Sequence, residues 1–182
     1  MKDLERYEID GRATRINNTD ISDWWNLQQH FAYPPFNEFF DTDKLIEYYA
    51  EFSEGGIYQL EINIVNDIWL PVGLISWHPM VEGVHPVKFS KEEKVAYISD
   101  SITYKAYQNK GVQRHLFQCT FEEMKKQNYT TVYLRTSPNS NMCKLALKLG
   151  FIQIKDAFQK VRSMRVGGCI GEDDRIFFCK SL

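Results

Sequence analysis

The segment that most constrains the fold is a glycine turn between an apolar strand pattern and an amphipathic helix pattern, Tyr107-Gln-Asn-Lys-Gly-Val-Gln-Arg-His-Leu-Phe117. The N–H groups in the first turn of a helix have no intrahelical acceptor, and the helix dipole adds partial positive charge there. Gly111 allows the chain to turn without a Cβ clash, and Lys110 and Arg114 add two positive charges. The junction therefore predicts a phosphate site. A plain strand–helix turn is the alternative.

The residues after this turn alternate between helix and strand patterns. Apolar residues at three- and four-residue spacings predict a helix from Val112 to about Gln127, and a β-rich run predicts a strand over 130–136. Ser137-Pro138-Asn139 predicts a break and a helix cap. The short helix after it is expected to end at Gly150, before a strand over 151–154.

Upstream of the turn, the pattern predicts strands separated by two helices. Asn66-Asp67 is a sequence typical of a hairpin turn. The expected strands are 7–16, 57–65, 68–77 and 95–103. The expected helices are 20–31 and 41–52, with an aromatic loop at 32–40 between them. A long polar loop is expected over 78–93, and a last strand over 175–179.

The order of these elements resembles the GCN5-related N-acetyltransferase (GNAT) family, which marks its acetyl-coenzyme A (acetyl-CoA) site with Gln/Arg-x-x-Gly-x-Gly/Ala. Gln108-Asn-Lys-Gly111-Val-Gln113 matches this motif, with Gln113 at the position that is usually Gly or Ala. The family's second mark is an Asn followed eleven residues later by Gly-Phe. Asn139 and Gly150-Phe151 match it. The resemblance covers about residues 95–154.

The resemblance implies an α/β (α+β) fold built on a twisted mixed sheet. We expect six or seven strands, splayed between the fourth and fifth, with helices on both faces. One domain would span residues 1–182. Within it, 1–94 would form the acceptor-side half, 95–154 the acetyl-CoA-binding core and 155–182 the C-terminal strands.

The resemblance also implies acetyl-CoA as the acyl donor, with its pantetheine arm in the gap between the splayed strands. Backbone groups of Ile102 and Thr103 would bond the pantetheine, and Asn139 would bond the pantetheine or a group in its vicinity. The diphosphate would be held by the motif residues Gln108, Asn109, Lys110, Gly111, Val112, Gln113 and Arg114.

The implied reaction is transfer of the acetyl group to a primary amine by direct attack on the thioester. The family often places a proton-donating Tyr seven residues after the Asn, but this chain has Ala146 there. Tyr97, Asp100 and Tyr133 are the candidates for acid and base, each with packing or a strand-end position as the alternative. Strand alternation places Tyr97 and Asp100 on opposite faces unless a bulge intervenes.

The acceptor is expected to bind near the aromatic loop, with Trp24, Tyr33 and Phe36 as the candidate contacts. Residues 1–100 carry 8 Lys/Arg and 18 Asp/Glu, so acidic and aromatic groups coincide there. These surroundings favour a cationic small molecule or a protein amine.

The second half of the chain is basic, because residues 101–182 carry 14 Lys/Arg and 6 Asp/Glu. This charge fits an anionic cofactor, but a solvated basic face is also possible. An acetyltransferase acting on nucleic acid or aminoacyl-tRNA is a less favoured alternative, because the sequence pI is only about 6.1. An acyl-CoA-binding regulatory module with weak or no catalysis is another, suggested by Ala146 and Gln113.

Composition predicts a cytoplasmic protein without a metal. The four Cys lack C-x-x-C spacing, and the four His show no metal-ligand spacing. No window of about 18 apolar residues predicts a membrane span, and the charged N-terminus is unlike a signal peptide. A monomer or a homodimer is expected.

Overall fold

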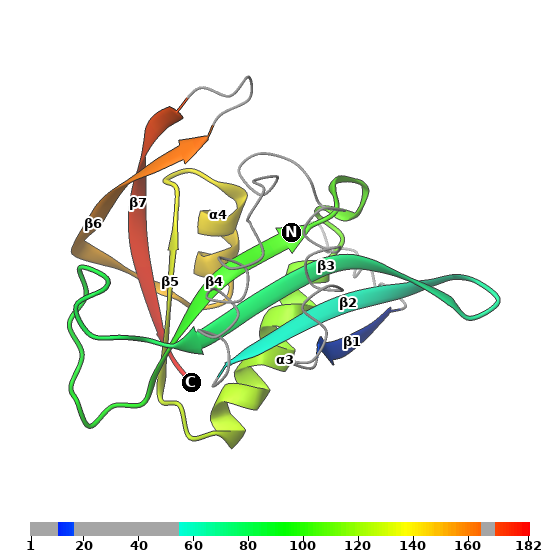
Figure 1. Cartoon of the computed structure of the whole chain (residues 1–182), viewed down its shortest axis with the longest axis horizontal. Helices are drawn as coiled ribbons and strands as arrows, with labels where there is room; N and C mark the ends of the chain where they lie inside the picture. The colour runs from blue at the N-terminus through cyan, green and yellow to red at the C-terminus, as the bar shows by residue number, and fades with distance from the viewer. Residues whose placement is uncertain (1–10, 17–54, 165–169) are drawn as a thin grey trace, which may run out of the picture.

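The computed structural model of the chain describes residues 11–16, 55–164 and 170–182 (Figure 1). The predicted helices 20–31 and 41–52, the aromatic loop 32–40 and the start of the first predicted strand lie outside the described residues.

The described residues form a seven-stranded mixed sheet in the order β1-β2-β3-β4-β5-β7-β6. The strands are β1 (Gly11–Ile16), β2 (Gly56–Val65), β3 (Ile68–Pro79), β4 (Val95–Thr103), β5 (Thr131–Thr136), β6 (Ile152–Met164) and β7 (Ile170–Ser181). β4 and β5 are parallel, and every other neighbouring pair is antiparallel. The predicted mixed sheet is confirmed.

The hairpin between β2 and β3 turns at the predicted dipeptide. Asn66 and Asp67 have φ values of 48° and 64°, and a tight hairpin turn needs positive φ at both central residues. Asn and Asp tolerate this conformation better than most side chains, which is why the dipeptide identified the turn.

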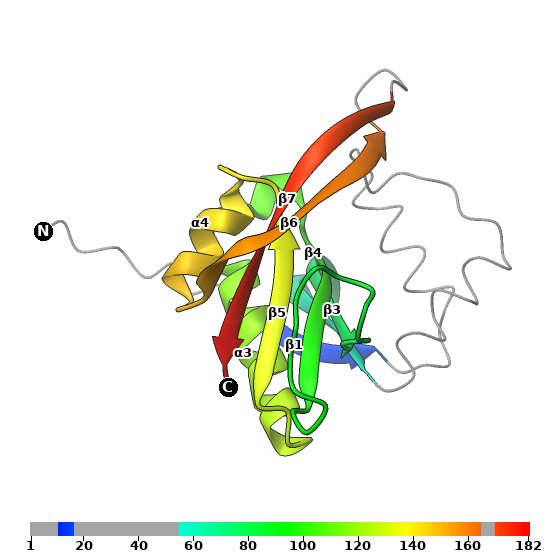
Figure 2. The ribbon, with the colours of Figure 1, turned by 90° about the vertical axis from the view of Figure 1, so that its left-hand side faces the viewer.

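Two helices and one short 3-10 turn complete the described structure: α3 (Val112–Lys126), α4 (Asn141–Lys148) and η1 (Lys105–Tyr107). Figure 2 shows α3 and α4 on the same side of the sheet. The predicted cap of α4 is wrong by one residue. Ser140 is the N-cap, and its hydroxyl accepts a hydrogen bond from the Cys143 N–H at 3.0 Å. Asn139 has a φ of 62°, whereas a side-chain N-cap is typically in extended backbone, as Ser140 is.

The sheet has an apolar core on each face. Under α3 and α4, the core includes Trp77, Ile98, Leu116, Phe117, Leu134, Ala146 and Phe178. On the opposite face, a second core contains Met80, Val87, Val95, Tyr97, Tyr133, Ala157 and Phe177. Met80 and Val87 come from the connection between β3 and β4, which was predicted as a polar loop. That connection instead contributes buried side chains to the second core.

Within residues 11–16, 55–164 and 170–182, no helix has the length and apolar character needed to cross a membrane.

Candidate active site between the splayed strands

The two parallel strands at the centre of the sheet separate part-way along their length. β4 and β5 pair from Val95↔Thr131 to Ile98↔Leu134. Beyond Ile98, β4 continues to Thr103 paired with β3, while β5 continues to Thr136 paired with β7. Figure 1 shows the two strands diverging. The predicted splay between the fourth and fifth strands is confirmed.

The register of β4 decides which backbone groups face the gap. The Tyr104 N–H donates to the Val72 carbonyl at 2.9 Å. Residue pairs in an antiparallel ladder alternate between hydrogen-bonded and non-hydrogen-bonded pairs. Ile102, two residues before Tyr104 and opposite Leu74, therefore also directs its backbone N–H and carbonyl towards β3. The backbone groups of Ser101 and Thr103 face away from β3. The prediction that Ile102 offers backbone bonds to pantetheine does not fit this register, whereas the same prediction for Thr103 does.

A β-bulge lies at the point where β4 leaves β5. Ile98 pairs with Trp77 and Asp100 with Ser76, so Ser99 is an extra residue. A bulge shifts the alternation of all later side chains by one. Tyr97 and Asp100 therefore share the face opposite α3, which corrects the simple alternation expected from the sequence.

The predicted phosphate turn, residues 108–111, leads into a helix whose first turn has no side-chain cap. Gly111 is the N-cap of α3 with a φ of 84°, no side chain caps the helix, and its first turn holds no acidic residue. The exposed Lys110 lies with its Nζ 5.0 Å from the centre of the Tyr107 ring. The first-turn N–H groups of α3 therefore remain available to an anion.

Gln113, at the unusual motif position, ties the first turn of α3 to the open part of β4. Its amide nitrogen donates to the carbonyls of Leu74 and Ile102 and to the Thr103 hydroxyl, at 3.2, 2.5 and 3.0 Å. Its amide oxygen accepts from the Ser101 hydroxyl at 2.6 Å. The side chain is thus directed into the protein, and its bulk does not occupy the anion site.

Gly73 on β3 allows α3 to approach the sheet closely. A Cβ at this position would lie 2.3 Å from Val112 Cγ1 and 3.2 Å from Leu116 Cδ1. Real Cβ atoms essentially never come within 3.0 Å of such neighbours. Because Val112 begins α3, this contact fixes the phosphate turn against the sheet.

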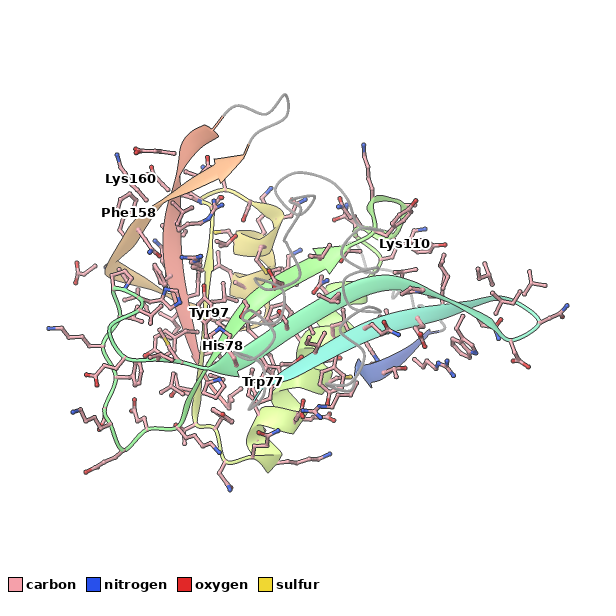
Figure 3. All side chains as sticks on the ribbon, viewed as in Figure 1. Trp77, His78, Tyr97, Lys110, Phe158 and Lys160 are labelled. Carbon is pink, nitrogen blue, oxygen red and sulfur yellow. The ribbon has the colours of Figure 1, made fainter. Side chains whose placement is uncertain are left out.

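Tyr97 lies on the opposite face, one residue before the strands separate. The ring of His85 stacks on it at 4.4 Å between centroids, and the ring of His78 lies at 5.5 Å. Figure 3 shows His78 beside Tyr97. Burial, with a smaller contribution from the Asp100 carboxylate, raises the pKa of Tyr97. Burial lowers the pKa of His85 to about 4, and the Arg135 charge adds to this effect. At neutral pH, Tyr97 is therefore a protonated phenol beside an uncharged imidazole.

Asp100 and Tyr133 share this face with Tyr97. The Ser76 hydroxyl donates to the Asp100 carboxylate at 3.0 Å. Tyr133 pairs with Tyr97 across the two strands, is 7% exposed, and has its pKa raised by burial. The three candidate acid–base residues are thus near one another, and Tyr97 and Tyr133 both also pack in the second core.

The sequence profile of the acetyltransferase (GNAT) family matches residues 21–151. The chain belongs to this family. No curated protein sequence matches the chain.

Solved structures of other proteins share the fold of this GNAT chain at low sequence identity. Arabidopsis thaliana NAA60 in complex with acetyl-CoA has a TM-score of 0.69 at 11% identity, with 94% of this chain and 98% of that chain covered. The ribosomal-protein-S18-alanine N-acetyltransferase from Escherichia coli has a TM-score of 0.63 at 14% identity, covering 94% and 93%. The putative acetyltransferase yncA from Salmonella typhimurium, solved with acetyl-CoA, has a TM-score of 0.62 at 17% identity, covering 95% and 94%.

The GNAT chain departs from its family where a Tyr is often found. Ala146 is fully buried in the core beneath α4, so no hydroxyl projects from this position. Asn139, the other residue of that motif, is exposed in the connection between β5 and α4. The predicted acceptor contacts Trp24, Tyr33 and Phe36 lie outside the described residues.

Two residues on the face of the sheet that carries Tyr97, Asp100 and Tyr133, hereafter the acceptor face, were not singled out from the sequence of this GNAT chain. His85 is brought over Tyr97 only because the connection between β3 and β4 folds back on the sheet. Arg135 is the first β5 residue after the last pair with β4. The sequence predicted that Arg135 lies on a strand, but not that Gln159 of β6 and Arg175 of β7 would lie near it.

Within the described residues, no group of three or more His, Cys, Asp or Glu side chains is arranged to hold a metal ion.

Proposed function

We propose that this GNAT acetyltransferase uses acetyl-CoA to acetylate a primary amine by direct attack on the thioester. The observation that carries the proposal is the placement of two features on neighbouring elements. The uncapped N-terminus of α3 lies next to the open part of β4, from Ser99 to Thr103. An anion-binding helix end and a free strand edge together suit a ligand with a diphosphate and an amide-rich arm. The Arabidopsis and Salmonella structures, which share the fold, contain acetyl-CoA.

In this proposal the segment 108–114 holds the diphosphate through backbone N–H groups, with Lys110 and Arg114 adding charge. Ser101 and Thr103 offer strand-like hydrogen bonds to the pantetheine arm, and Asn139 lies beyond its end. The Gln113 network holds these two parts of the site in a fixed relation.

The chemistry needs a neutral amine, a donor for the departing thiolate and a path for the amine proton. Tyr97 is our candidate donor, because its hydroxyl is on the residue just before the point where β4 and β5 separate. The Asp100 carboxylate, which shares this face with Tyr97, is the candidate proton acceptor. Tyr133 is the second hydroxyl on this face. This arrangement replaces the donor that Ala146 does not supply.

The test begins with cofactor binding. Calorimetric titration with acetyl-CoA is expected to show one site, which Gly111→Glu abolishes. The substitution strains a left-handed position by about 1–2 kcal/mol. It also places a carboxylate near the diphosphate, where repulsion is about 3 kcal/mol per charge at roughly 5 Å and intermediate dielectric.

Gly83→Glu is the matched control, because Gly83 has a φ of 85° and open space around its Cα. Release of the coenzyme A thiol, measured over a panel of primary amines, then tests catalysis. Equal acetyl-CoA affinity in Gly111→Glu and Gly83→Glu would contradict the assignment of the phosphate turn. Binding without any amine-dependent thiol release would contradict the assignment of activity.

A further inference from the structure

Two arginines lie on the acceptor face of the sheet, beside Tyr97. Arg135 follows the last β4–β5 pair, and its neighbour Leu134 packs on the α3 side, so Arg135 points to the opposite face. Arg175 shares that face, because it lies two residues before the buried Phe177 on β7. The charges of both guanidinium groups act on the Tyr97 hydroxyl. The two side chains therefore lie on the same face as Tyr97, near the point where the strands separate.

These arginines are held in place by neutral groups. Arg135 Nη1 donates to the Gln159 amide oxygen at 2.7 Å, and Arg175 Nη1 donates to the Ser137 hydroxyl. The ion pairs found in the described part of the chain are Arg12–Glu61 and Arg15–Glu123. Among these residues, no carboxylate lies within 4.0 Å of either arginine. Both side chains are half-buried. Each guanidinium group has five N–H donors, so N–H groups remain for a bound anion.

The cofactor does not account for this charge. The proposed diphosphate site is at the start of α3, whose residues Val112 and Leu116 pack against the other face of the sheet. A guanidinium group matches a carboxylate in shape and binds it through paired hydrogen bonds. Since Arg135 is adjacent to the point of strand separation, an anion bound there would be part of the acceptor.

We propose that the acceptor is a primary amine that also carries a carboxylate a few bonds from the nitrogen, and that Arg135 and Arg175 bind this carboxylate. The inference rests on the proposed function and names its substrate class. In the reaction, the amine nitrogen forms a bond to the acetyl carbon, the carbon–sulfur bond breaks, and the amine proton leaves while the thiolate gains one. The carboxylate undergoes no chemistry; its binding directs the amine towards the thioester. The acidic residues that favoured a purely cationic acceptor lie mainly outside the described residues, whereas the described part of the site carries Arg135 and Arg175 as well as the Asp100 carboxylate.

The test compares amines that differ only in the anion. Glycine, β-alanine and γ-aminobutyrate are each assayed against their own carboxamide, with putrescine as a dication and a peptide with N-terminal aspartate as a protein-like acceptor. Thiol release is expected to be at least tenfold more efficient, in kcat/KM, for one of the free acids than for its amide. Preference for the peptide over the free amino acids would assign the carboxylate to a protein N-terminus.

Variants then locate the binding group. Arg135→Gln and Arg175→Gln are each expected to raise KM for the preferred acid at least about tenfold, the loss typical of one charged hydrogen-bonded contact. KM for acetyl-CoA should not change, and the preference for acid over amide should collapse. Lys160→Gln is the matched control, since it removes an exposed positive charge from β6, away from Tyr97 (Figure 3). It should leave all constants unchanged.

The inference and the proposed function can fail separately. If amides or putrescine are acetylated as well as the acids, or if the arginine variants keep the acid preference, the inference is overturned and the acetyltransferase assignment stands. If acetyl-CoA binds but no amine of either kind is acetylated, both are rejected. Thermal stabilisation of each variant by acetyl-CoA shows that it is folded.

Discussion

The contact between Gly73 and Val112 gives a direct test of how the phosphate turn is positioned. Gly73→Ala would place a Cβ 2.3 Å from Val112 Cγ1, and ordinary contact begins at 3.4 Å, so α3 or the Val112 side chain must move by about 1 Å. Val112 is 2% exposed and Leu116 is fully buried, so neither can turn towards solvent. Overpacking of this kind costs about 1–3 kcal/mol. Replacing Gly by Ala also lowers the conformational entropy of the unfolded chain, which stabilises the folded protein by about 0.4–1 kcal/mol. A net loss of about 1–2 kcal/mol is expected.

A double-mutant cycle separates this clash from other effects. Val112→Ala alone removes two buried methyl groups and should cost about 1.5 kcal/mol. In Gly73→Ala/Val112→Ala, the new methyl group fills the space that Val112 vacates. The double mutant should therefore be no less stable than Val112→Ala. The two substitutions would then have a favourable coupling free energy of about 1–2 kcal/mol, which corresponds to about 2–8 °C in Tm for a chain of this size.

Urea unfolding followed by circular dichroism, together with acetyl-CoA titration, measures both consequences. Affinity for acetyl-CoA should fall in Gly73→Ala and recover in the double mutant, because the helix N-terminus moves away from the diphosphate and then returns. Stability costs that simply add, within about 0.5 kcal/mol, would refute the reasoning that this contact fixes α3 on the sheet.

Other predictions follow from the hydrogen bonds and pKa shifts around the site. Gln113→Ala should lower the free energy of unfolding by about 1–3 kcal/mol, since it leaves buried partners unsatisfied. It should also weaken acetyl-CoA binding; an unchanged affinity in calorimetry would show that the Gln113 hydrogen bonds do not support the cofactor site. Tyr97→Phe should lower kcat at least about tenfold with little change in KM for acetyl-CoA, and an unchanged kcat would remove Tyr97 from the mechanism. Burial lowers the pKa of His85 from 6.5 to about 4 in the folded protein. As the pH falls from 6.5 to about 4, His85 therefore binds a proton in the unfolded chain but not in the folded protein, and stability decreases. Urea midpoints from pH 7 to pH 4 should therefore decrease more for the wild type than for His85→Gln, and parallel decreases would contradict this assignment.

The sequence predicted most of the sheet because its strands have strong local signals. Asn66-Asp67 identified one hairpin, and the run 95–103 coincides with β4. Gly111 identified the start of α3, since its positive φ and the helix that follows are both local properties. The cap of α4 was misplaced by one residue because Asn139 and Ser140 are both good cap residues. Only the backbone conformation, extended at Ser140 and left-handed at Asn139, distinguishes them.

The acceptor face could not be predicted in the same way, because its residues meet through long-range pairing. The bulge at Ser99 depends on the register of β3 against β4, and it alone brings Tyr97 and Asp100 to one face. His85 reaches Tyr97 because the connection between β3 and β4 folds back on the sheet, where its Met80 and Val87 are buried in the second core. Such contacts leave no periodic trace in the sequence.

The two departures from the family pattern have different physical consequences. Replacing a small residue by Gln113 adds bulk at the cofactor turn, but the amide finds partners for both its nitrogen and its oxygen on β3 and β4. A side chain satisfied in this way strengthens the connection between the anion site and the strand edge, so the departure is compatible with cofactor binding.

Ala146 is different, because a buried methyl group offers no substitute for a hydroxyl. In our proposal the proton donor therefore comes from another element, and Tyr97 on β4 is next to the gap. The proposed proton transfer then takes place on the face of the sheet that also carries Arg135 and Arg175, so acceptor binding and proton transfer would share one set of neighbours.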